Sequence, residues 1–68
     1  MKLVITMDLD NAAFTEGMGE GEGADGDIVA EVLHDVADGF RGAPADVGDV
    51  EIIRDPNGNR IGSAKVTA

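Results

Sequence analysis

The segment from Asp27 to Arg41 constrains the fold most, because it is the only stretch of the 68-residue chain whose apolar residues recur with a helical period. These apolar residues form one stripe, made of Ile28, Val29, Val32, Leu33, Val36 and Phe40. We expect Asp25 or Asp27 to cap the first turn, and Gly42 and Pro44 to end the helix. The valines lower its intrinsic propensity, so the helix depends on packing against the rest of the chain.

The opposite face of this helix is acidic. It carries Asp27, Glu31, Asp35 and Asp38, with the only histidine, His34, spaced to pair with Asp38. The chain has a net charge of -9, and residues 1–48 hold the whole excess, with eleven acids against two basic residues. Such a surface repels nucleic acid and membranes and attracts basic proteins. We therefore predict a protein partner at this acidic face, and no direct binding of nucleic acid or membranes.

The first strand is predicted from the alternation of Lys2 to Leu9, KLVITMDL, which is typical of a half-buried strand. Leu3, Ile5, Met7 and Leu9 share one face of this strand. After it, we expect Asp10 to cap a single helical turn that folds Phe14 back onto the core.

Residues 15–26, TEGMGEGEGADG, combine five glycines with four acids and have no apolar periodicity. Such a segment buries too little apolar area to offset its ordering entropy, so we interpret it as a flexible loop. The alternative is a cation site formed by Glu16, Glu20, Glu22 and Asp25, although the sequence gives this site no fixed ligand geometry.

A C-terminal hairpin is predicted over Asp49 to Thr67, with Pro56 leading the turn and Gly58 in its left-handed position. This turn pairs Ile53 with Ile61, and it places Arg54 opposite Arg60. The predicted core side is Val50, Ile52, Gly62, Ala64 and Val66, and the predicted open face, suited to self-association, carries Val4, Ile53 and Ile61. A two-residue turn at Asn57-Gly58 is the alternative, and it shifts the register by one.

The same turn has the alternating oxygen ligands of a calcium loop, but Arg60 and Val66 stand where that loop needs glycine and glutamate. With no cysteine and one histidine, the chain offers no recognisable nucleophile and base, so we expect neither an enzyme nor a bound cofactor. No run approaches the length of a membrane span, and no signal pattern starts the chain, so a cytoplasmic protein is expected.

Together these elements predict one α+β domain over residues 1–68, β-α-β-β, with a three-stranded sheet and one helix packed on one face. The sequence leaves the strand order open. A helical crossover makes the first two strands parallel, and the uncovered face of so small a sheet is a candidate for association.

Two phrases, Asp8–Phe14 (DLDNAAF) and Arg54–Gly62 (RDPNGNRIG), resemble those of small uncharacterised proteins from bacteriophages and mobile elements of high-GC bacteria. The resemblance spans most of the chain outside the glycine-acid loop, and it implies an origin, a size class and the cytoplasm of a bacterial host, without an activity. On this basis we expect an acidic accessory protein that binds a host or phage protein. We expect its acidic face to mimic DNA and so to inhibit a basic, nucleic-acid-handling host protein. The alternative is a non-catalytic assembly module that forms a homodimer through the open sheet face.

Overall fold

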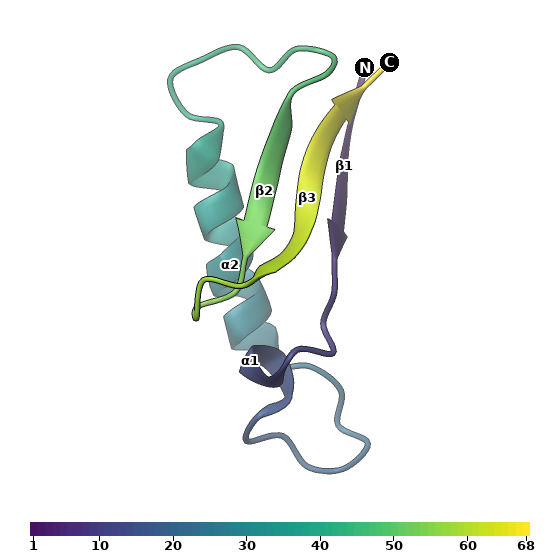
Figure 1. Ribbon diagram of the computed structural model, residues 1–68, viewed down its shortest axis with the longest axis vertical. Helices are drawn as coiled ribbons and strands as arrows, with labels where there is room; N and C mark the ends of the chain where they lie inside the picture. Colours follow the sequence, from purple (N-terminus) through teal and green to yellow (C-terminus); the bar gives the residue numbers. More distant parts are fainter.

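The protein folds into one three-stranded sheet with a long helix along one side, as the computed structural model of residues 1–68 shows (Figure 1). The elements are β1 (Lys2–Met7), α1 (Ala12–Thr15), α2 (Gly26–Gly39), β2 (Val50–Arg54) and β3 (Arg60–Thr67). The predicted α+β class, with β-α-β-β topology and one helix on one face of the sheet, is confirmed, and α1 is the single helical turn expected after the first strand.

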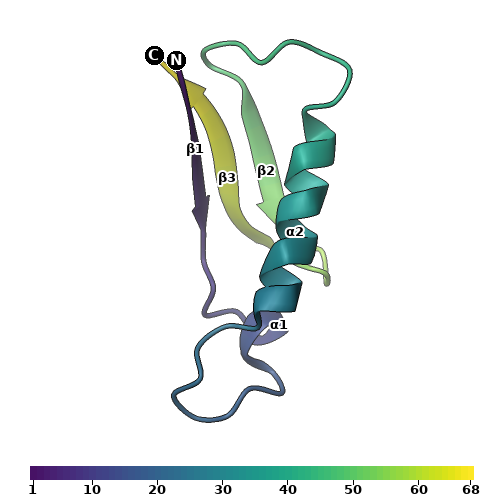
Figure 2. The same ribbon diagram turned by 180° about the vertical axis from the view of Figure 1, so that it is seen from behind.

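The strand order is β1-β3-β2, so the last strand lies in the middle of the sheet. β3 pairs antiparallel with both neighbours, and β1 and β2 therefore run in the same direction at the two edges. Seen from behind, α2 lies over the β2 side of the sheet and leaves β1 uncovered (Figure 2).

The core is small, with seven buried apolar residues: Phe14, Val32, Val36, Ile53, Ile61, Ala64 and Val66. Phe14 is completely buried because α1 turns it inward, as predicted. The capping residue is Asn11 and not Asp10, since the Ala13 amide donates to Asn11 Oδ1 at 2.8 Å.

The apolar period predicted a helix from Asp27 to Arg41. Helix α2 runs from Gly26 to Gly39, so it begins one residue earlier and ends two residues earlier than expected. Asp25 is the N-cap, and its carboxylate accepts a hydrogen bond from the Asp27 amide at 2.9 Å. The helix ends at Gly39, which has the lowest helix propensity of its last turn. Beyond it, Arg41 donates to Asp38 at 2.7 Å, so Asp38 pairs with this arginine and not with His34.

The hairpin turn is the proline-led one. The Asp55 amide donates to the Asn59 carbonyl and the Gly58 amide to the Asp55 carbonyl, both at 2.9 Å. Gly58 has a φ of +87°, the left-handed conformation that glycine adopts without strain. As this turn requires, Arg54 lies opposite Arg60.

The predicted register beyond the turn is wrong. The pairing shifts between Ile53 and Arg54, so that Ile53 lies opposite Gly62 and Ile61 is left as an extra residue on β3. A β-bulge of this kind displaces the inside-outside alternation by one residue. In consequence Ile52 moves from the predicted core side to the open face.

The correction reverses the assignment of the β2 side chains. Ile53 and Ile61 are only 1% and 8% exposed and belong to the core, whereas Val50 and Ile52 are exposed. Of the predicted self-association face, Val4 alone remains exposed, so a homodimer built on the Ile53 and Ile61 pair is excluded.

Candidate functional site

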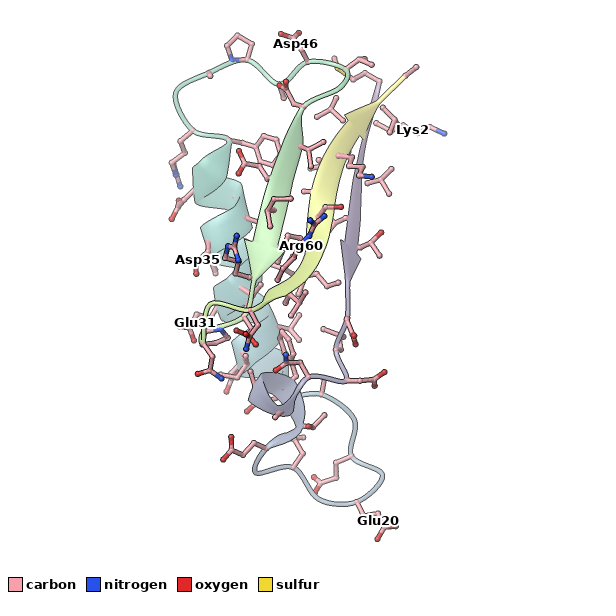
Figure 3. All side chains as sticks on the ribbon, viewed as in Figure 1. Lys2, Glu20, Glu31, Asp35, Asp46 and Arg60 are labelled. Carbon is pink, nitrogen blue, oxygen red and sulfur yellow. The ribbon has the colours of Figure 1, made fainter.

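Four carboxylates form a continuous line on α2, which we call the acidic stripe: Asp27, Glu31, Asp35 and Asp38. All four are exposed, and at about 100° per residue they fall within roughly 80° of the helix circumference. Figure 3 shows Glu31 and Asp35 on the flank of α2 that faces away from β1. The single ion pair of the chain joins Asp38 to Arg41, so three stripe residues have no cationic partner.

A cleft of about 340 Å³ lies between α2 and β2, and Asp35 and Glu51 both line it. Glu51 faces the helix because it pairs with Ala64, a core residue of β3. Its carboxylate lies close to Gly39, where an added Cβ would come within 2.8 Å of Oε2. The absence of a side chain at Gly39 thus gives Glu51 its place beside the acidic stripe.

Glu51 is the acidic residue of this surface that sequence reasoning missed. The predicted hairpin register put it on the open face of the sheet, away from the helix. No residue near it signals the bulge at Ile61, so the sequence alone carried no sign that Glu51 faces the helix.

Asp55 is the buried carboxylate of the hairpin turn, and its role is structural. Its Oδ1 accepts hydrogen bonds from the Asn57 and Asn59 amides, both at 2.9 Å. Burial by itself would raise the pKa of Asp55, but the hydrogen bonds from Asn59 and Asn57 outweigh burial, and the pKa is lowered. The carboxylate therefore serves the turn in its charged form.

The open face of the sheet carries basic residues beside its apolar ones. By the observed register it holds Lys2, Arg54, Arg60 and Lys65 next to the exposed Val4, Val50 and Ile52, and the single strand acid, Glu51, lies on the other face. Figure 3 shows Arg60 lying across the sheet on the side opposite α2. Four of the five basic residues of the chain thus lie on the open face of the sheet, whereas α2 carries four acids and no lysine or arginine.

The acids of the glycine-acid loop are not brought together. No three His, Asp or Glu side chains are grouped as a metal site would require, and Glu20 lies at the far tip of the loop (Figure 3). The loop is closed at its base, where the Asp25 amide donates to the Phe14 carbonyl at 2.7 Å. The structure therefore does not assemble the cation site considered for Glu16, Glu20, Glu22 and Asp25.

No protein-family model, curated protein or solved structure matches this chain. The resemblance to phage and mobile-element proteins stays a prediction. Neither helix of the structure has the length and apolar character needed to span a bilayer.

Proposed function

We propose that this protein is a small, non-catalytic, phage-type accessory protein that binds a basic partner through the acidic stripe, in the cytoplasm of a bacterial host. Its partner would be a nucleic-acid-handling host protein that it inhibits. The observation that supports this function most is the exposure of four aligned carboxylates, three of them without a cation. Glu51 adds a carboxylate in the cleft beside β2, which Asp35 and Arg54 also line.

The charge density of the stripe suits a site that accepts nucleic acid. From Asp27 to Asp38 the helix rises about 17 Å, so neighbouring carboxylates are spaced about 5.5 Å apart along the axis. One strand of DNA carries a phosphate about every 3.4 Å. A basic groove shaped for one phosphate strand would therefore meet on α2 somewhat more than half of the negative charge density of that strand.

The local stripe, more than the net charge, should govern this binding. At physiological ionic strength exposed charges are screened beyond about 8 Å. Glu20, at the tip of the glycine-acid loop, extends away from the helix (Figure 3). Loop acids of this kind would add to long-range attraction and little to the docked contact.

The test starts from a partner captured out of bacterial lysate at low salt, whose affinity is then measured with variants. The variant Glu31→Lys/Asp35→Lys changes the stripe, and Glu16→Lys/Glu20→Lys changes the loop by the same charge, from -9 to -5. Reversing two exposed charges that each contact a cation should cost about 2 kcal/mol, or roughly 30-fold in affinity. We expect that loss for the stripe variant and a much smaller one for the loop variant.

The same experiment measures the salt dependence of the affinity and the competition by DNA. The affinity should fall steeply from about 50 mM to about 500 mM salt, and DNA should compete for the captured protein. Equal losses of affinity in both variants would show that the total negative charge, and not the acidic stripe, determines binding. An affinity that does not change with salt concentration would show that binding is not electrostatic, and it would overturn the proposal.

A further inference from the structure

Helix α2 has a second exposed flank that is free of acids. Ala30, Leu33, Ala37 and Phe40 recur at i, i+3, i+7 and i+10, the spacing of a helix-packing seam, and we call them the apolar seam. Leu33 was expected in the core but is 37% exposed. By helical spacing it shares a flank of α2 with Ala37 and Phe40, which line a groove together with Leu3 of β1.

Beside the apolar seam lies an open groove above β1. Leu3 and Ile5 pair with the core residues Val66 and Ala64, so they face the helix side of the sheet. They are nevertheless 53% and 42% exposed, because α2 does not reach β1. At its Leu3 end the groove has a volume of about 450 Å³, and no acidic residue lines it there.

The size of the core indicates that this groove is covered in the functional state. A chain of 68 residues with seven buried apolar side chains has no disulfide, since it has no cysteine, and no grouped metal ligands. Small domains of this kind are commonly stabilised by oligomerisation instead. The chain exposes 4694 Å², whereas a monomer of its mass exposes about 4,000 Å². The molecule is elongated, with extents of 40 × 21 × 17 Å, so it has surface enough for the roughly 800 Å² that one partner buries in a standard interface.

We propose that a second copy of this chain occupies the groove. A two-fold interface needs a self-complementary patch, and here the exposed Leu33 lies on the flank of α2 whose Ala37 and Phe40 line the groove. The two α2 helices would pack through Ala30 and Ala37, whose small side chains allow close approach. Leu33 of each copy would then cover Leu3 and Ile5 of the other.

The charges of α2 agree with this arrangement. The acidic stripe lies on the flank away from the apolar seam, so both stripes point outward from the dimer and stay free to bind. Each copy carries a charge of -9, and their mutual repulsion is reduced by salt. Self-association should therefore strengthen with salt, whereas binding through the acidic stripe should weaken.

Sedimentation equilibrium of the full chain tests the proposal, from about 1 μM to about 500 μM, the range in which interfaces of modest size form. The wild-type mass should rise from 7.0 kDa to twice that value. Ile5→Lys places a charge beside the groove, on the same face of β1 as Leu3. Ile52→Lys is its control on the open face, with nearly equal exposure of 42% and 41%. We expect at least a tenfold weaker dimer for Ile5→Lys and an unchanged dimer for Ile52→Lys.

A second variant keeps the test independent of folding. Ala37→Glu adds an acid to the exposed apolar seam without removing any core atom, and far-UV circular dichroism verifies that the helix is retained. It too should give a monomer. A wild-type mass of 7.0 kDa throughout, dimers that survive both groove variants, or dimers lost on Ile52→Lys alone would each overturn the proposal. The opposite salt dependence distinguishes this outcome from failure of binding at the acidic stripe.

Discussion

Two neighbouring isoleucines on β2 should respond very differently to truncation. Ile53 is 1% exposed and packs in the core with Phe14 and Val36, whereas Ile52 is 41% exposed on the basic face. Ile53→Ala removes buried methyl and methylene groups and leaves a cavity. That change typically costs about 2 to 5 kcal/mol.

The loss should be large on the scale of the whole domain. A chain of this length has a free energy of unfolding of about 3 to 10 kcal/mol, so Ile53→Ala removes between about a fifth of it and all of it. Ile52→Ala loses only the covered part of its side chain and forms no cavity, for about 0.5 to 1 kcal/mol. The melting temperatures of the two variants should then differ by at least about 4 °C, and by more than about 10 °C in the middle of these ranges.

Urea and thermal unfolding, followed by far-UV circular dichroism, provide the measurement, since the chain has no tryptophan or tyrosine for fluorescence. All samples are compared at one concentration, because self-association would make the melting temperature depend on it. Equal losses for the two variants, or a larger loss for Ile52→Ala, would refute the bulged register and restore the register expected from the turn alone.

Two further changes probe the hairpin. Gly62→Ala should destabilise the fold by about 1 to 3 kcal/mol, because an added Cβ would overlap the Thr6 carbonyl oxygen of β1, and an unchanged melting temperature would contradict this close approach. The lowered pKa of Asp55 means that its carboxylate stabilises the fold above its unfolded value of 3.8, and that this contribution is lost as the pH falls through the still lower folded pKa. Asp55→Asn should therefore be less stable at pH 7 and lose less stability on acidification than the wild type, in thermal scans from about pH 7 to about pH 2. Parallel profiles would show that the Asp55 charge has no part in stability.

Local patterns predicted the elements, because local chemistry decides them. The apolar period marked α2, and the alternation of β1 placed Leu3, Ile5 and Met7 on one face. Pro56 and Gly58 fixed the turn, since each favours the backbone conformation needed at its position. Phe14 was placed in the core because the phrase before it reads as a helical turn.

What the sequence did not show depends on contacts between distant residues. The bulge at Ile61 has no composition of its own, yet it turns Ile53 inward and Glu51 toward the helix. The sequence also did not indicate that β3 lies in the middle of the sheet. For the same reason it did not indicate which strands α2 covers. Leu33 was therefore assigned to the core, when its flank of the helix lies beside the uncovered β1.

In the candidate site, too, the features set by local sequence patterns could be predicted, and those set by contacts between distant residues could not. The four acids of the stripe could be predicted, because helical spacing alone aligns them. The basic open face and the apolar groove could not, since both depend on the register and on the lateral position of α2. Together they give the helix two chemically distinct flanks, one suited to a basic partner and one to a second copy.

If the acidic stripe, and not the acidity of the whole chain, is the binding surface, a basic ligand should contact only the stripe and Glu51. Amide chemical-shift mapping of the ¹⁵N-labelled protein during titration with a lysine-rich peptide measures this. Shifts should concentrate at Asp27, Glu31, Asp35 and Glu51, with little change at Glu20 and Glu22. Shifts of equal size along the glycine-acid loop, or spread over every acid of the chain, would contradict it.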